Sequence, residues 1–371
     1  MTKMRFWKTA TKAFFLCALV SALACAQTTT TFEAPGAGTG AGQGTLSEFI
    51  NAQGLTLGYY IDSNGVDHGF IRSANGNFVT FSAPGAGTGS GQGTLGESIN
   101  PAGTLTGYSI DGGGAMHGFL RSANGTFITY DAPGAGTGAG QGTLSLNINP
   151  DGAVAGYYLD SGSNAHAFLR LKDGNFTTYE VAGAGTGAGQ GTGTASGIGL
   201  SPNGTITGAY IDSNNSLHGY MRTFDGTVTD IDAPGGGTGP MQGTDTDGLN
   251  PAGVIPGPYV DTNNVAHGYV RATDGSFTTF DAPGAGTGAG QGTIPEGINP
   301  QGAVTGYYVD SNSASHGFLR APGGTITTFD APGAGTSAGQ GTFAFLDNAS
   351  GAITGYDIDG NGVNHGFIRT P

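Results

Sequence analysis

Cysteine, tryptophan and basic residues are scarce in this chain. Its 371 residues include two cysteines, one tryptophan and 12 lysines and arginines, against 26 acidic residues. Both cysteines, Cys17 and Cys25, and the tryptophan, Trp7, lie within the first 26 residues. Residues 27–371 therefore contain no thiol for nucleophilic catalysis, for a zinc–thiolate centre or for an iron–sulfur cluster.

The scarcity of positive charge also limits the partners. The formal net charge is −14, and binding to nucleic-acid phosphates requires clustered lysines and arginines. We therefore expect no nucleic-acid partner. Glycine is abundant, with 74 residues, but it does not occupy every third position as in collagen. Apolar residues recur in short regular runs, which argues against a disordered chain.

The first 26 residues have the pattern of a signal peptide. Four basic residues precede an apolar run at 13–26, which is too short to span a bilayer. Small residues at Ala24 and Ala26 are typical of a signal-peptidase site, so we predict cleavage before Gln27. We then expect residues 27–371 to form one secreted, extracellular domain without a membrane span. The alternative locations are the periplasm and the cell surface. Lipid attachment at Cys25 is the alternative to simple cleavage.

Seven copies of one unit fill residues 27–371. Every histidine follows an aspartate by six residues and precedes an arginine by four. Successive histidines are 49 residues apart, except for one interval of 52. The histidines are His68, His117, His166, His218, His267, His316 and His365. A period of this length is typical of propellers and solenoids.

Turn-forming residues divide each unit into four short strands. In the second unit, Asn100-Pro101-Ala102-Gly103 has the preferences of a type I turn. Asn124-Gly125 predicts a two-residue hairpin turn, whose central residues both need positive φ. The strands expected there are 94–99, 105–110, 117–121 and 126–131. Four antiparallel strands per unit are typical of a β-propeller blade, with a parallel β-solenoid as the alternative.

The two ends of the repeat array complement each other. The last unit stops after its third strand, at Arg369, whereas Thr28–Glu33 supplies a fourth strand without the preceding three. An open array would leave sheet edges exposed, and closure removes them. The predicted fold is all-β: a seven-bladed β-propeller of four-stranded antiparallel blades, closed by the N-terminal strand, which completes the last blade.

The recurring aspartate and histidine are expected to face each other across a hairpin. A five-residue loop at 63–67 would put Asp62 opposite His68 and Tyr60 opposite Phe70. Such a pair also suits general-base catalysis or half a metal site. Seven equivalent pairs without a nucleophile favour a structural hydrogen bond instead. The repeated arginines, such as Arg72, are expected to form ion pairs between blades.

One hairpin offers a weak calcium site. Asp62, Asn64 and Asp67 resemble part of an Asp-x-Asn-x-Asp loop, and calcium takes clustered oxygen ligands. The alternative is a turn rich in Asn, Gly and Ser for backbone reasons. No other metal or cofactor is expected, because the glycine-rich segment 36–45 lacks the lysine and helix of a phosphate-binding loop. We expect Gln43 and Thr45 to make fixed hydrogen bonds there.

The repeated pattern Gly-Tyr-x-x-Asp followed by His-Gly-Phe-(Leu/Ile)-Arg resembles the HAF repeats of extracellular bacterial proteins. The likeness covers nearly all of residues 28–371. Only residues 166–168 read His-Ala-Phe, and the other six units have His-Gly-Phe or His-Gly-Tyr. The resemblance implies export and a β-rich repeat structure. It implies no activity, substrate or catalytic residue.

These features favour a secreted, non-enzymatic binding or surface-interaction module whose partner is an unknown protein or glycan. One alternative is a lectin-like propeller that binds carbohydrate weakly at several similar sites. Tyrosines such as Tyr59, Tyr157 and Tyr307 would then stack on sugars. The glycine-rich connections and the Asp–His hairpins are expected on one face of the ring, which is the better binding surface because it has the longer loops.

A second alternative is an enzyme that acts on extracellular polysaccharide. It would need a pocket built from acids that depart from the repeat, namely Glu48, Glu97, Asp247 and Glu296. These acids occupy roughly equivalent positions in four of the seven units. We expect them to form a solvated rim rather than a catalytic centre.

Overall fold

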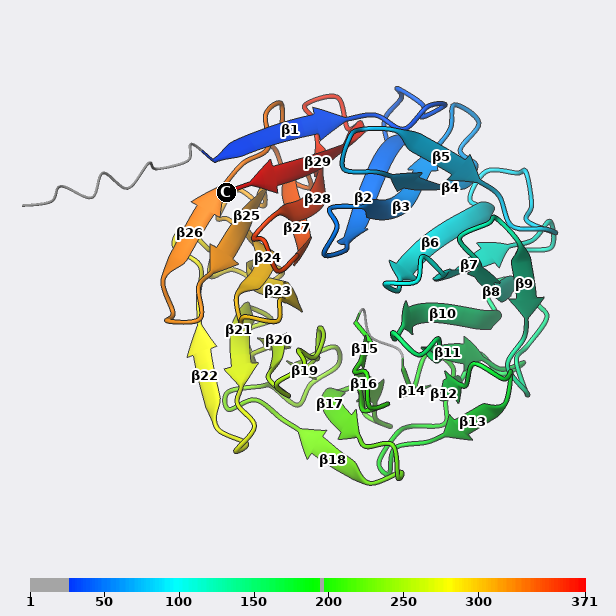
Figure 1. Cartoon of the computed structure of the whole chain (residues 1–371). Coiled ribbons are helices and arrows are strands. Elements are labelled where there is room, and N and C mark those ends of the chain that lie inside the picture. Colours follow the sequence, from blue (N-terminus) through cyan, green and yellow to red (C-terminus); the bar gives the residue numbers. More distant parts are fainter. Residues whose placement is uncertain (1–26, 194–196) are drawn as a thin grey trace, which may run out of the picture.

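The computed structural model describes residues 27–193 and 197–371. Every regular element in these two ranges is a strand, and the strands form seven sheets arranged around one axis (Figure 1). The chain has the predicted all-β, seven-bladed propeller fold. The predicted signal peptide and Cys25 lie outside the described residues. No helix in the described ranges is long and apolar enough to cross a membrane.

Three consecutive blades begin the ring, each with four strands that run outward from the axis. The first has β2 (Gly44–Ile50), β3 (Thr56–Ile61), β4 (Asp67–Arg72) and β5 (Phe78–Phe81). The second has β6 (Gly93–Ile99), β7 (Leu105–Ile110), β8 (Met116–Arg121) and β9 (Phe127–Tyr130). The third has β10 (Gly142–Ile148), β11 (Val154–Leu159), β12 (Ala165–Arg170) and β13 (Phe176–Tyr179).

The fourth and fifth blades have shortened innermost strands. The fourth has β14 (Gly191–Thr192), β15 (Gly199–Leu200), β16 (Ile206–Ile211), β17 (Leu217–Arg222) and β18 (Val228–Ile231). The fifth has β19 (Gly243–Thr244), β20 (Ile255–Val260), β21 (Ala266–Arg271) and β22 (Phe277–Phe280). In the fifth blade, Pro256 and Pro258 on β20 have no backbone N–H, so the ladder beside β19 is incomplete.

The sixth and seventh blades return to the regular pattern. The sixth has β23 (Gly292–Ile298), β24 (Val304–Val309), β25 (Ser315–Arg320) and β26 (Ile326–Phe329). The seventh has β27 (Gly341–Asp347), β28 (Ile353–Ile358) and β29 (Asn364–Thr370), and its outer strand is β1 (Thr28–Phe32).

The N-terminal strand closes the ring, as the sequence predicts. β1 pairs antiparallel with β29, from Thr28 opposite Thr370 to Phe32 opposite Gly366. The first and last colours of the chain therefore lie side by side (Figure 1). This clasp gives the seventh blade its fourth strand and leaves β29 without an open edge.

Hydrophobic cores fill the spaces between neighbouring blades. In one of them, Leu57 and Phe81 of the first blade pack with Leu105 and Phe119 of the second. The Phe81 ring meets Phe119 edge-on at 6.4 Å. It also covers Gly69, where an added Cβ would lie 2.2 Å from the ring. This contact explains why glycine follows the histidine in this blade.

The turns differ from the sequence prediction in one respect. The Asn100–Gly103 turn is confirmed, with the Gly103 amide donating to the Asn100 carbonyl over 3.0 Å. The Asn124-Gly125 turn is not the predicted two-residue hairpin. Its Gly125 amide donates to Ser122, and only Gly125 has positive φ. A type I turn followed by a left-handed glycine therefore connects these strands.

The Asp–His hairpin has a different register from the predicted one. Tyr60 lies opposite His68, rather than opposite Phe70, and Ile61 lies opposite Asp67. The Asp62 amide donates to the Val66 carbonyl, so the loop begins one residue earlier than expected. Asp62 still reaches His68 diagonally, with Oδ2 3.4 Å from Nε2.

Candidate functional site

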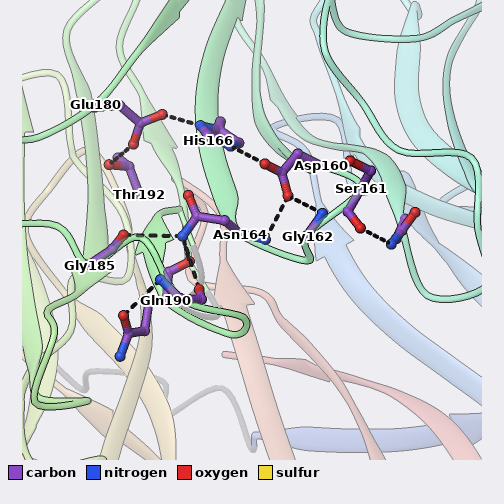
Figure 2. A network of polar contacts seen from close by, with 11 residues as sticks. Asp160, Ser161, Gly162, Asn164, His166, Glu180, Gly185, Gln190 and Thr192 are labelled. Carbon is purple, nitrogen blue, oxygen red and sulfur yellow. Dashed lines mark hydrogen bonds and ion pairs between the residues drawn. The ribbon is translucent and has the colours of Figure 1, made fainter.

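Each Asp–His hairpin holds its histidine between two polar side chains, and the third blade shows the arrangement clearly (Figure 2). His166 Nε2 lies 3.3 Å from Asp160 Oδ2, and His166 Nδ1 contacts Glu180. Glu180 accepts a second hydrogen bond, from the Thr192 hydroxyl over 2.9 Å. Two backbone amides of the loop donate to the other carboxylate oxygen of Asp160. The side chains thus connect two strands, a hairpin loop and the start of the next blade.

The two polar contacts of the histidine recur in all seven blades. The distance from the histidine Nε2 to the preceding aspartate is 3.3–3.8 Å throughout. The partners of Nδ1 are Ser82, Asp131, Glu180, Asp232, Asp281, Asp330 and Glu33. In five blades a tyrosine ring also stacks on the imidazole, at 4.8–5.0 Å between centroids. Seven such networks support the structural interpretation of the Asp–His pair.

The paired carboxylates affect the charge of the histidines. At His117, burial opposes protonation, but hydrogen bonds and charges from Asp131 and Asp111 outweigh it and raise the pKa of the imidazole. At Asp111, backbone hydrogen bonds, that of Ala115 first, and the contact with His117 lower the pKa of the carboxyl. The ionised pair is therefore favoured in the folded protein.

The glycine-rich connections are fixed by the predicted glutamine and threonine. Gln43 Oε1 accepts from the Gly40 amide over 2.9 Å, and its Nε2 donates to the Ser63 carbonyl over 3.2 Å. The Thr45 hydroxyl accepts from the Ala34 amide over 2.9 Å. The hydrogen bond from Gln43 to the Ser63 carbonyl ties the connection to the Asp–His hairpin, so both lie on the same face of the ring. The predicted placement of the two loop types is confirmed.

The weak calcium site at Asp62, Asn64 and Asp67 stays a prediction. Asp62 Oδ1 accepts from the backbone amides of Asn64 and Val66, at 2.7 and 3.0 Å, and its Oδ2 faces His68. In the two described ranges, no group of three or more histidine, cysteine, aspartate or glutamate residues is placed to hold a metal ion.

Asp67 instead lines a cavity of about 530 Å³ between the first and second blades. We call this cavity the inter-blade pocket. Its wall includes Gln43, Tyr59, Ile61, Ser63, Asn64, Asp67, Ser90 and Leu95. Burial, together with the charge of Asp62, raises the pKa of the Asp67 carboxyl to about 6, and His68 opposes this shift. The pocket combines a carboxylate, amide and hydroxyl groups with an aromatic ring and two aliphatic side chains.

Two residues of the inter-blade pocket depart from the repeat. At the position of Asp67 the other six units have Met116, Ala165, Leu217, Ala266, Ser315 and Asn364. At the position of Ser90, five units have alanine and one has Pro240. Asp67 begins β4 of the first blade, and Ser90 lies in the connection that enters the second, so neighbouring units bring them together. In the sequence, Asp67 and Ser90 could have been recognised as candidate site residues because they differ from the residues at the equivalent positions of the other units.

The arginines do not form the predicted ion pairs between blades. They lie over aromatic rings of the preceding blade, as Arg72 lies 4.6 Å above the Phe32 ring and Arg222 lies 4.5 Å above the Tyr179 ring. Six of the seven arginines have such a ring. The interaction is between blades, as expected, but it is a cation–π contact. Sequence reasoning missed it because the two partners are some 40 residues apart.

The four off-consensus acids converge on the axis of the ring. Glu48, Glu97, Asp247 and Glu296 all line a central cavity of about 460 Å³, which we call the channel. The prediction of a solvated rim is therefore wrong. Asp247 is only 2% exposed, and the three glutamates are half-buried.

A β-bulge explains why the three glutamates point to the axis. In five innermost strands the pairing with the second strand skips one residue, at Glu48, Glu97, Leu146, Glu296 and Phe345. A bulge bends its strand and re-aims the extra side chain. All five bulged residues line the channel.

The channel raises the pKa of its carboxyls. Burial, followed by the charges of Glu97 and Glu296, raises the pKa of Glu48 well above its usual value. Burial raises the pKa of Glu97 to about 7, and burial with the charge of Asp245 raises that of Glu296 to about 8. Near neutral pH the channel therefore holds both protonated and ionised carboxyls.

The tyrosines named from the sequence lie on second strands, in three different surroundings. Tyr59 lines the inter-blade pocket, whereas Tyr307 lines the channel. Tyr157 packs against Gly193, where a Cβ added to the glycine would lie 2.6 Å from the Tyr157 Cβ atom. Of these three, only Tyr59 stands beside the off-consensus Asp67.

Comparison with known proteins identifies the fold and no family. Neither a protein-family model nor a curated protein sequence matches the chain. The chain is similar in structure to the lectin BP39L from Burkholderia pseudomallei, with a TM-score of 0.50 and 12% identity over 88% of this chain and 96% of the lectin. The shared fold is a β-propeller. The resemblance to HAF repeats stays a prediction.

Two further structures show weaker likeness. Puromycin hydrolase has a TM-score of 0.49 at 14% identity, and the match covers 86% of this chain but 52% of the hydrolase. Aleuria aurantia lectin has a TM-score of 0.40 at 13% identity, over 76% of this chain and 94% of the lectin.

Proposed function

We propose that this protein is a secreted, non-enzymatic β-propeller that binds carbohydrate in the inter-blade pocket. The observation that carries the proposal is the Asp67 carboxylate, which faces a sugar-sized cavity. No hydrogen bond from another residue of the described chain reaches this carboxylate. Its oxygens are free to accept from ligand hydroxyls, and such charge-assisted hydrogen bonds are stronger than neutral ones.

The rest of the pocket suits a sugar ring. Small-molecule sites combine apolar walls with a few well-placed polar groups. Tyr59, Ile61 and Leu95 supply an apolar wall, against which the C–H face of a sugar can pack. The Asn64 amide and the Ser90 hydroxyl line the same cavity as Asp67. They add donors and acceptors for hydroxyl groups.

The structural likeness to BP39L supports the proposal at the level of the fold, because that protein is a lectin. The occurrence of both Asp67 and Ser90 at one interface favours one principal site over seven equal weak sites. The hypothesis of weak, multivalent binding then applies to the other interfaces.

A glycan array tests the proposal. We expect wild-type protein to bind a defined set of glycans and the Asp67→Ala variant to lose at least about tenfold in affinity, a change of about 1.4 kcal/mol. Alanine already occupies this position in the third and fifth units, so the variant should fold. Ser315→Ala, at the equivalent position of the sixth blade, is the matched control and should bind like wild type. Equal binding by D67A and wild type would refute the proposal.

A polysaccharide-active enzyme is the second candidate function, and the channel acids favour it. A glycosidase needs one carboxyl that is protonated and another that is ionised, and the raised pKa values of Glu97 and Glu296 provide such a mixture. The discriminating experiment is an assay for reducing ends released from polysaccharides. Turnover that disappears in Glu296→Gln and persists in D67A would favour the enzyme.

A further inference from the structure

The channel wall is acidic and aromatic. Besides the four carboxyl groups it includes Phe49, Tyr307, Phe343, Phe345 and Tyr356, and none of its residues is basic. The seven arginines lie in the third strands of the blades, away from this wall. Carboxyl groups are therefore concentrated on the axis of the ring, and no positive side chain of the wall balances the charge of those that ionise.

One carboxyl group of this wall has an oxygen without a hydrogen-bond partner among the described residues. Asp247 is 2% exposed, and its Oδ2 makes no hydrogen bond with any described residue. Buried carboxylate oxygens in folded proteins are normally paired. Asp247 lines the channel together with Glu296, so a cation in the channel would supply the missing partner.

The aromatic residues form a second, independent part of the wall. The Phe343 and Phe345 rings both stack on Tyr356, at 5.1 and 5.5 Å between centroids. Tyr307 meets Phe343 edge-on at 5.0 Å. The face of an aromatic ring attracts ammonium groups, most strongly where water is excluded.

The arrangement suits an organic cation better than a metal ion. No three acids or histidines in the described part of the chain converge closely enough to hold a metal. A cavity of about 460 Å³ accommodates a ligand several atoms long. Such a ligand can reach carboxyls on different blades and contact the aromatic cluster at the same time.

We propose that the channel binds an organic ammonium ligand, a linear di- or polyamine, between the carboxylates of Asp247 and Glu296 and the aromatic rings around Tyr356. The ligand is distinct from the carbohydrate proposed for the inter-blade pocket. The site is built from residues of the fifth, sixth and seventh blades and is therefore present once per molecule.

Binding should be linked to protons. The titratable groups that face one another across the channel are Glu48, Glu97, Asp247 and Glu296. Other titratable groups lie close enough to interact with their charges, namely Asp245, Tyr59, Tyr108, Tyr307 and Tyr356. An ammonium group favours the ionised form of each carboxyl, so binding releases protons. We expect the affinity to rise as the pH increases from 6 through about 7 and 8, where Glu97 and Glu296 ionise.

The probe is spermidine, titrated into residues 27–371 by calorimetry at pH 8 in two buffers of different ionisation enthalpy. We expect saturable binding with proton release, weakened about tenfold in Glu296→Gln because one charge contact is lost. The control is Asp173→Asn, which removes the same charge from an exposed turn where the first two units already have asparagine. It should bind within about twofold of wild type.

Three results would overturn the proposal. They are the absence of saturable binding, equal weakening in E296Q and D173N, and binding of calcium in place of spermidine. Asp247→Asn provides a second variant, and its melting temperature is measured first. If it folds, spermidine affinity should fall as in E296Q, whereas D67A should leave it unchanged.

Discussion

Removal of the N-terminal strand tests the closure of the ring. We compare a chain that begins at Gln27 with one that begins at Ala34, which lacks β1 and Glu33. In the shorter chain β29 loses its only outer neighbour, because β1 pairs with it over five residues. The seventh blade then has three strands, and its outer backbone groups are exposed.

The magnitude follows from the contacts of Phe32 and the strand ladder. Phe32 packs on Phe70 and Phe78 at 6.2 and 5.8 Å, and the Arg72 guanidinium lies 4.6 Å from its ring. A fully buried phenylalanine contributes roughly 1.5–3 kcal/mol, of which the half-buried Phe32 supplies a part, and each ladder hydrogen bond contributes about 1 kcal/mol. The loss is therefore a large part of a typical net stability of about 5–15 kcal/mol.

Thermal unfolding followed by circular dichroism, with size-exclusion chromatography, provides the assay. We expect the melting temperature of the shorter chain to fall by about 10 °C or more, with aggregation through the open edge of β29. A synthetic peptide of residues 27–35 should restore part of the loss. An unchanged melting temperature and a monomeric elution profile would refute the closed ring.

Two further predictions concern stability. The pKa values of Glu97 and Glu296 are higher in the folded state than their unfolded value near 4.5, so stability should fall as the pH rises from 5 to 8, by at most about 1.4 kcal/mol per pH unit for each group. Melting temperatures measured across this range should depend less on pH in E97Q and E296Q than in wild type. An unchanged pH dependence in these variants would contradict the burial of these acids. Arg222→Ala should destabilise the protein by about 1 kcal/mol more than Arg271→Ala in urea unfolding. Arg222 lies over Tyr179, whereas the residue equivalent to Tyr179 in the blade that precedes Arg271 is Ile231, which has no aromatic ring. Equal losses would contradict the cation–π contact.

The sequence was informative about architecture because the repeat multiplies weak signals. Four strands per unit recur around the ring, and a proline or glycine marks most of the turns between them, so the blade follows from the period. The location of β1 follows from counting, since the unit that ends at Arg369 lacks one strand. The pairing register of the strands was less predictable than their number. In the Asp62 hairpin, the carboxylate accepts from the amides of Asn64 and Val66, and this side-chain cap starts the loop one residue early.

The candidate sites depend on contacts that local sequence does not encode. Glu48 and Glu97 reach the channel because a bulge turns them toward the axis, and a bulge alters pairing without a distinctive residue. Asp67 and Ser90 are 23 positions apart, and only the packing of one blade on the next puts them in one pocket. Their departure from the repeat was visible, but its meaning required the fold.

A crystal structure of the protein with the strongest glycan from the array tests the central claim most directly. The account predicts the sugar in the inter-blade pocket, with hydroxyl groups hydrogen-bonded to the Asp67 carboxylate and the ring packed against Tyr59. It also predicts that D67A crystals soaked under the same conditions show no sugar there. A sugar bound elsewhere on the ring, with an empty pocket at Asp67, would contradict the account.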